Sequence, residues 1–101
     1  MEKTTKVFIS QPMRGKSTEQ IKEEREVAIN TLKEHYDSIE VLESVFDDFN
    51  EGTHPLKFLS RAINTLADAD VAVFMEGWKD ARGCKIEHDC ALNYSIPVWY
   101  L

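Results

Sequence analysis

A glutamate that follows a loop is the residue of this sequence whose type and position best suit chemistry. Glu87 comes shortly after Gly77–Gly83, which carries an aromatic residue, two cations and an acid between two glycines, a loop composition. That loop follows the apolar run Val71–Met75, which predicts a parallel strand buried on both faces. From Cys84 the spacing becomes helical, so we expect Glu87 in the first turn of a helix. Ligands of open α/β sheets bind at that edge, where the strands end.

The Glu87 carboxylate suits two different tasks. As a nucleophile on the anomeric carbon of a sugar, it would split a difficult displacement into two easier steps. That task needs access to a crevice and a partner that protonates the leaving group. As an acid near a helix N-terminus, it would only stabilise the helix by about 0.3–1 kcal/mol through the dipole. The sequence pattern leaves both interpretations open.

The loop after the first predicted strand is a second candidate site. Gly15–Ser17 opens a helix straight after that loop, and the free N–H groups of a helix N-terminus attract anions. The segment nearly matches the phosphate-loop pattern G-x-x-x-x-G-K-[ST], but Ser10 stands at its first glycine and Pro12 removes one N–H. We therefore expect either a modest anion site that uses Arg14 or Lys16, or a well-capped surface helix.

The other reactive side chains of the Glu87 segment carry weaker signals. Cys84 and His88 are four residues apart on one helix face, as metal ligands sometimes are, but no second pair has ligand spacing. We expect no metal and no cofactor. Cys84 and Cys90 face different sides of the predicted helix, so no disulfide is expected between them. Trp78 either stacks on a base or packs on the neighbouring helix as a lid residue.

The elements that must position these residues alternate between strands and helices. The expected strands are Val7–Ile9, Ser38–Leu42, Val71–Met75 and Ile96–Leu101, and the expected helices run from Ser17 to about Tyr36, from Leu56 to Ala67 and onward from Cys84. The inward face of the last helix is expected at Ile86, Cys90, Ala91 and Tyr94. The irregular segment Glu43–Pro55 is either a flap beside the crevice or a surface excursion.

This order of elements predicts an α/β fold with a small, doubly wound parallel sheet. We expect one domain over residues 1–101, about four strands in the order 2-1-3-4, and helices on both faces of the sheet. The switch point between the first and third strands places their following loops side by side. Ser10–Ser17 and Gly77–Glu87 should therefore form the walls of one crevice.

Composition and charge narrow the classes of function. The 101 residues are 43% hydrophobic, enough for a real core, and the net charge of −6 argues against a nucleic acid polymer as the partner. A domain of this size buries only about 60–65% of its unfolded surface and would gain from forming an oligomer. We find neither a signal-peptide pattern nor an apolar run long enough for a bilayer. We therefore expect a cytoplasmic protein without a membrane partner.

Several short segments together point to a known group of proteins. They are Val7–Gly15, Asp70–Phe74, Gly77–Trp78, Ala81–Cys84, Glu87 and Ala91. With these segments the chain resembles a family of small bacterial and phage proteins that is similar to the nucleoside 2-deoxyribosyltransferases and the nucleoside 5′-monophosphate N-glycosidases. The resemblance implies a flavodoxin-like, Rossmann-like fold and cleavage or exchange at an N-glycosidic bond. It also implies a homo-oligomer with sites near subunit interfaces.

The resemblance also assigns roles to individual residues. The catalytic glutamate falls on Glu87. The implied substrate-binding residues are Phe8, Ser10, Gln11, Pro12, Met13, Arg14, Gly15, Gly77, Trp78, Asp80, Arg82 and Gly83. Among these, Ser10–Gly15 and in part Arg82–Gly83 would hold the sugar or the phosphate, and Trp78 would lie near the base. The implied substrate is a small molecule, a nucleoside or a nucleoside monophosphate.

Two positions depart from the pattern of the resembled enzymes. Phe8 stands where they usually have a tyrosine, and Ala62 stands where they have an aspartate, eight residues before Asp70. That aspartate assists with the sugar or with proton transfer. Either the acid comes from elsewhere, with Asp80 and Asp89 as candidates, or the site binds without turnover. We therefore carry N-glycosidic cleavage or deoxyribosyl transfer as the first hypothesis, a non-catalytic nucleotide-binding module as the alternative, and a purely structural protein as a third.

Overall fold

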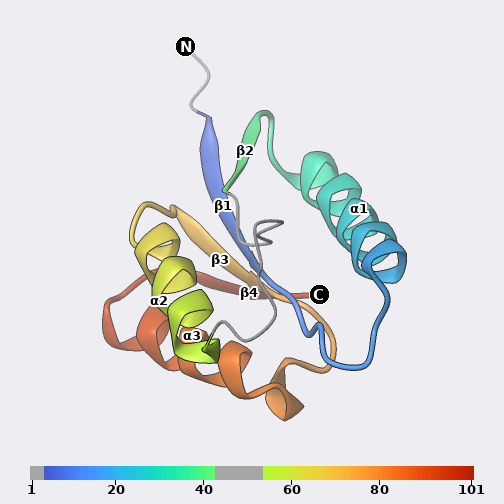
Figure 1. Cartoon of the computed structure of the whole chain (residues 1–101). Coiled ribbons are helices and arrows are strands. Elements are labelled where there is room, and N and C mark those ends of the chain that lie inside the picture. The colour runs from blue at the N-terminus through green and yellow to red at the C-terminus, as the bar shows by residue number, and fades with distance from the viewer. Residues whose placement is uncertain (1–3, 43–53) are drawn as a thin grey trace.

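The computed structural model describes residues 4–42 and 54–101, in which four parallel strands form one sheet (Figure 1). The strands are β1 (Thr5–Ser10), β2 (Ile39–Leu42), β3 (Val71–Phe74) and β4 (Val98–Tyr100), and their spatial order is β2-β1-β3-β4. The helices are α1 (Thr18–His35), α2 (Pro55–Leu66), the short 3₁₀ helix η1 (Trp78–Asp80) and α3 (Arg82–Asn93). The predicted fold class and strand order are confirmed. Of the predicted flap or excursion, all but its last two residues lie outside the described residues.

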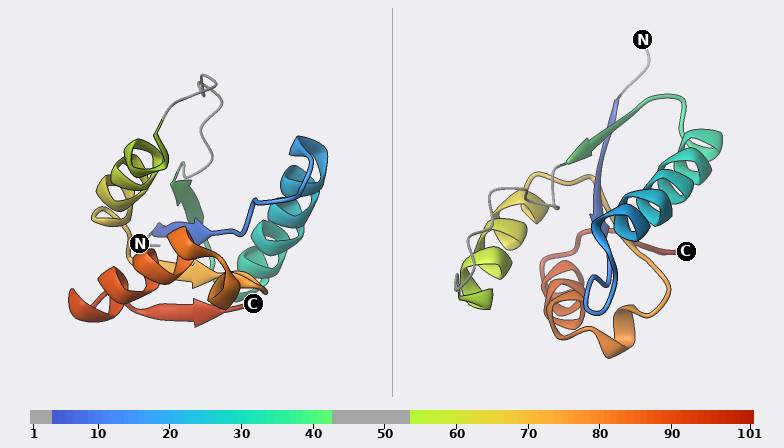
Figure 2. Two further views of the ribbon diagram at one scale, coloured as in Figure 1. Left: turned by 60° about the horizontal axis from the view of Figure 1, so that its bottom comes forward. Right: turned by 45° about the vertical axis from the view of Figure 1, so that its right-hand side comes forward.

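Helices cover both faces of the sheet, as predicted. Helix α1 lies on one face, and α2 and α3 lie together on the other (Figure 2). Two apolar cores result, because successive side chains of a strand point to opposite faces. The core on the α1 side contains Val7, Ile9, Leu32, Val71 and Val73. The core on the side of α2 and α3 contains Phe8, Ala62, Leu66, Ala72, Phe74 and Ala91.

The centre of the sheet fixes the relation between the two loops of the predicted crevice. Strand β1 pairs with β3 in a register that ends at Ser10 opposite Phe74. Just beyond it, the Met75 N–H donates to the Ser10 carbonyl at 3.1 Å. Further along, a Cβ atom added at Gly77 would lie 3.5 Å from Cγ of Pro12. The loops after β1 and β3 therefore run side by side, as the proposed topology requires.

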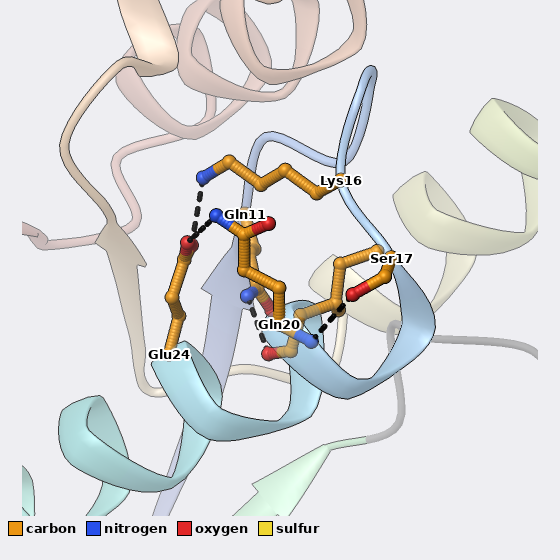
Figure 3. Close-up of polar contacts among 6 residues, drawn as sticks. Gln11, Lys16, Ser17, Gln20 and Glu24 are labelled. Atoms are coloured by element: carbon orange, nitrogen blue, oxygen red, sulfur yellow. Dashed lines mark hydrogen bonds and ion pairs between the residues drawn. The ribbon is translucent and has the colours of Figure 1, made fainter.

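At the start of α1, one of the two hydrogen bonds of the predicted capping box is formed. The Ser17 hydroxyl accepts a hydrogen bond from the Gln20 N–H at 3.1 Å, which makes Ser17 the N-cap. The Gln20 side chain does not return this bond, since its amide nitrogen lies 3.3 Å from a Glu24 carboxylate oxygen (Figure 3). The first turn of α1 is thus capped by the chain itself, which supports the interpretation of a well-capped helix.

Helix α3 begins two residues earlier than the sequence predicts. It starts at Arg82, so Glu87 is its sixth residue and lies in the second turn rather than the first. The prediction failed because the N-cap, Ala81, offers no side-chain hydrogen bond, and the glycine that follows Arg82 belongs to an apparent loop composition. A helix-terminal role for Glu87 loses its basis, because the dipole effect falls off within the first turn.

The inward face of α3 also differs from the prediction. Ile86 and Tyr94, expected inside, are 37% and 79% exposed. The buried residues are Cys84, Glu87 and Ala91. The prediction chose the inward face of the helix by its apolar residues. It missed the buried face because a glutamate, Glu87, lies at the centre of that face. Outside residues 1–3 and 43–53, no helix combines the length and the apolar character that crossing a bilayer requires.

Candidate functional site

A buried hydrogen bond joins the two loops of the predicted crevice. The Ser10 hydroxyl donates to Oε1 of Glu87 at 2.6 Å, and the two residues are 1% and 8% exposed. Ser10 is the last residue of β1, and its side chain points to the same face as that of Phe8, the face covered by α3. Glu87 reaches it from the second turn of α3. A short bond of this kind, to a carboxylate with little solvent, is among the stronger hydrogen bonds in proteins.

The environment of Glu87 disfavours its charge. Burial raises the pKa of Glu87 above its ordinary value, and the hydrogen bond from Ser10 lowers it in part. Cys84 lies one turn earlier on α3 and is 5% exposed. Burial raises the pKa of Cys84 to about 11, a hydrogen bond with Ser10 opposes this, and the negative charge of Glu87 adds to the rise. Three polar groups therefore interact in one enclosed place, and Cys84 carries its proton at neutral pH.

Aromatic rings pack together next to this polar group. The Trp78 ring stacks on the ring of His88, with centroids 4.1 Å apart and an interplanar angle of 29°. Tyr100 lies beside both, and its hydroxyl is 2.6 Å from Nε2 of His88. The rings of Phe74 and His88 meet edge to face, with their centroids 5.0 Å apart. Trp78 packs on the neighbouring helix, because its partner His88 belongs to α3, and stacking of Trp78 on a base stays a prediction.

The cations of the first loop are arranged differently from a phosphate cradle. Lys16 Nζ forms an ion pair with Glu24 at 2.7 Å, and Figure 3 shows Lys16 and Gln20 converging on that carboxylate. Arg14 is exposed. Gln11 is 5% exposed, and its amide nitrogen donates to the Ile21 carbonyl at 2.7 Å. Its amide oxygen is buried and has no hydrogen-bond partner. Lys16 is thus already neutralised by the chain.

The residues predicted to bind substrate fall into three groups by exposure. Phe8, Ser10 and Gln11 are buried; Pro12, Met13, Trp78 and Gly83 are half-buried; Arg14, Gly15, Gly77, Asp80 and Arg82 are exposed. The structure brings Ser10 to Glu87 and Pro12 to Gly77. Phe8 has no exposed surface, so its ring faces the core rather than a ligand.

The two positions that depart from the resembled enzymes lie in one core. Phe8 and Ala62 belong to the same apolar cluster, between the sheet and the helices α2 and α3. A tyrosine hydroxyl and an aspartate carboxylate at these positions would be neighbours of that cluster, and here both are replaced by apolar groups. Both departures from the resembled enzymes therefore make the same part of the core more apolar.

An open groove of the described surface lies on the opposite face of the sheet from Glu87. It encloses about 500 Å³ and is lined by Lys16, Glu24, Val27, Met75 and Glu76. Met75 packs against the core on the α1 side, whereas Glu87 belongs to the side of α3. The groove therefore gives no access to Glu87.

Two contacts of the site escaped the sequence analysis. Cys84 was considered only as a metal ligand and as a disulfide partner, although its spacing of three residues from Glu87 places both on one helix face. The bond between His88 and Tyr100 joins α3 to the last strand, and no sequence signal indicates it. In the described part of the chain, no three side chains of the metal-binding types gather at one point.

A comparison with protein-family models gives a match over nearly the whole chain. A family model with the description Domain of unknown function (DUF4406) matches residues 5–100. The chain belongs to the DUF4406 family. The DUF4406 match includes both loops, Glu87 and all of β4, so the site described above lies within the shared domain. No curated protein gives a significant match.

Proposed function

We propose that this DUF4406 protein cleaves or exchanges the N-glycosidic bond of a nucleoside or nucleoside monophosphate, with Glu87 as the nucleophile. The observation that carries the proposal is the bond between Ser10 and Glu87 at the carboxyl ends of β1 and β3. This is the edge of an α/β sheet where ligands bind. The resemblance of the two loop segments to deoxyribosyltransferases and nucleotide N-glycosidases gives the substrate class.

The reaction would use the two oxygens of Glu87 differently. The Ser10 hydroxyl occupies Oε1 and holds the carboxyl in one orientation. Oε2 then attacks the anomeric carbon, the base leaves, and water or a second base resolves the glycosyl ester. Burial favours this step in the transition state, because the carboxylate loses its charge as the ester forms. The nucleophile must first be ionised, so activity should fall as the pH drops through the raised pKa of Glu87.

The acid that protonates the leaving base must come from a group other than residue 62. Asp80 and Asp89 are exposed carboxylates on η1 and α3, close in sequence to Glu87. A homo-oligomer is part of the proposal, since a second copy would complete a site that one chain leaves without this acid. Substrate phosphate would lie along Ser10–Gly15 and near Arg82, with the base toward Trp78.

A specific observation favours a second candidate, a nucleotide-binding module without turnover. Phe8 and Ala62 are both part of an apolar core, and Glu87 is 8% exposed. A site with apolar side chains at these two positions and a buried carboxylate has fewer groups for the chemistry than the resembled enzymes have. This module would bind the same small molecules and release no base.

One assay separates the two candidates. The protein is incubated with nucleosides and their monophosphates, with and without an acceptor base, and free base is measured by chromatography. Replacing the nucleophile in Glu87→Gln should lower base release by at least about 10²-fold. Glu23→Gln, a matched change at an exposed position of α1, should leave it unchanged.

The outcomes are distinct for each hypothesis. Base release that persists in Glu87→Gln contradicts the assignment of the nucleophile. No release by the native protein, together with a rise in melting temperature with one nucleotide, supports the binding module. If the native protein releases no base and no nucleotide changes its melting temperature, neither candidate is supported.

A further inference from the structure

We propose that Tyr100 is the acid that protonates the leaving base, and that His88 holds the phenol hydroxyl in place. The inference rests on the proposed function, in which Glu87 attacks the sugar and the residue at position 62 is an alanine that offers no proton. Tyr100 is singled out by its place in the sheet and by its bond to the residue that follows Glu87 on α3.

The last paired row of the sheet places Tyr100 on the same face as Ser10. Ser10 pairs with Phe74, and Phe74 pairs with Tyr100, so the three residues lie side by side on β1, β3 and β4. Their side chains point to the face that α3 covers, where Phe74 belongs to the apolar core. Neighbouring strands lie about 4.8 Å apart, so the backbones of Ser10 and Tyr100 are about 10 Å apart along this row.

Two consecutive residues of α3 bond to the two ends of this row. Glu87 accepts the hydrogen bond of the Ser10 hydroxyl at 2.6 Å, and Nε2 of His88 lies 2.6 Å from the Tyr100 hydroxyl. One turn of one helix thus holds both the proposed nucleophile and the phenol. Glu87 is 8% exposed and Tyr100 is 52% exposed, so the phenol lies toward solvent and the carboxylate lies inside.

Aromatic packing fixes the phenol ring near the place proposed for the base. The base is proposed to lie toward Trp78, and the rings of Trp78 and Tyr100 are stacked with their centroids 5.7 Å apart. The Phe74 ring lies on the Tyr100 ring as well, at 6.4 Å between centroids. A base beside Trp78 would therefore also be beside Tyr100. With Tyr100 in this role, the acid comes from the same chain as the nucleophile.

The proton balance of the reaction assigns the donor in the bond between His88 and Tyr100. When Nε2 of His88 carries a hydrogen, it donates to the phenol oxygen, and the phenol hydrogen is free for the base. The bond from the anomeric carbon to the base then breaks, its electron pair goes to the base, and a ring nitrogen of the base takes the Tyr100 proton. The anomeric carbon forms an ester with Oε2 of Glu87. The Nε2–H donor stabilises the phenolate that remains.

The second step restores both groups. Water, or the N–H nitrogen of an acceptor base, attacks the anomeric carbon, and the ester bond breaks to return the Glu87 carboxylate. The proton that the attacking group loses goes to the Tyr100 phenolate. No other co-reactant is needed.

The test compares the release of guanine and of 7-methylguanine, measured by chromatography, from guanosine, 7-methylguanosine and their 5′-monophosphates. The 7-methylated base is positively charged before cleavage and leaves as a neutral molecule, so its departure needs no acid. Tyr100→Phe keeps the ring and removes the hydroxyl. It should lower guanine release by at least about 10²-fold and leave 7-methylguanine release unchanged. His88→Phe, which keeps a ring beside Trp78, should lower guanine release by a smaller factor and also spare 7-methylguanine.

Matched variants separate the acid from packing and from the other candidate acids. Release of 7-methylguanine shows that a variant is folded and retains its nucleophile. Tyr94→Phe, the same change at a 79% exposed position at the end of α3, should leave the release of both bases unchanged. Asp80→Asn and Asp89→Asn should also leave both unchanged. A loss of guanine release alone in one of these two variants, with none in Tyr100→Phe, overturns the inference.

The remaining outcomes distinguish the acid from the reaction. An equal loss of both bases in Tyr100→Phe would give the hydroxyl a structural role and overturns the inference, and so does unchanged release of both. Neither result affects the nucleophile, because Glu87→Gln should lower the release of both bases. If the native protein releases neither base, the proposed function fails and the acid fails with it.

Discussion

Burial determines the chemical character of Glu87 more than its position in the sequence does. The carboxyl is 8% exposed and has Ser10 as its hydrogen-bond donor. Its location at the end of the sheet was predictable, because a strand, a loop and a helix precede it in order. Its burial was not, because residue patterns assign glutamate to the solvent side of a helix. The hydrogen bond with Ser10 was predictable only in part: the topology placed the two loops together, but it did not indicate which side chains would meet.

The raised pKa of Glu87 predicts how stability depends on pH. The folded protein holds this proton more tightly than the unfolded chain does, so the free energy of unfolding falls as the pH rises from the ordinary value of 4.5 through the folded-state pKa. Glu87→Gln removes this group, so the stability of the variant relative to the native protein should increase over that range. Urea unfolding at several pH values measures it. Glu23→Gln should show no such trend, and a parallel pH profile for Glu87→Gln would contradict the prediction.

At the scale of elements, the four strands and the helices α1 and α2 were predictable from the sequence, and the start of α3 was not. The apolar runs around Val7–Ile9 and Val71–Met75 indicated the two central strands, and the shortest strand, β4, was also found. Helix α3 begins at Arg82 and follows η1, a short turn that no pattern indicated. A single-residue signal for a helix start requires a capping side chain, and Ala81 has none.

Two glycines of this connection should respond oppositely to alanine. Gly77 has φ of 92°, a conformation that costs an alanine about 1–2 kcal/mol. Gly83 lies inside α3 with nothing within 4 Å of an added Cβ, so alanine there should stabilise by about 0.4–1 kcal/mol. Thermal unfolding of Gly77→Ala and Gly83→Ala measures both. Shifts of the same sign in the two variants would show that the turn before α3 differs from the one described.

At the scale of the whole molecule, the sheet divides two cores of different character. On the side of α1, apolar residues pack beneath an open groove that has charged residues in its lining. On the other side, an apolar core adjoins a buried polar group of Ser10, Cys84 and Glu87. The candidate chemistry belongs to this second side. Residue 62 lies in the core of this side, so a carboxylate there would affect how the sheet packs against α2 and α3.

Reintroducing the aspartate of the resembled enzymes tests that packing. Ala62 is 5% exposed, so Ala62→Asp should destabilise the protein by about 3 kcal/mol or more, because a buried charge lacks a partner. Ser60→Asp, on an exposed position of α2, should change stability by no more than about 0.5 kcal/mol. Urea unfolding compares the two. A small effect of Ala62→Asp would mean that residue 62 reaches solvent and that the crevice extends to α2.

The placement of Ser10 in the central strand has a consequence for how the site opens. Strand β1 is paired on both sides, and Val7 to Ser10 are at most 1% exposed. Amide hydrogens there should exchange with solvent only when the whole domain unfolds, whereas a helix on the outside can detach in smaller excursions. If α3 detached in such an excursion, Ser10 would stay in the sheet and Glu87 would move with the helix. Under the proposed function, movement of α3 rather than of β1 would then expose the Glu87 carboxylate to a ligand.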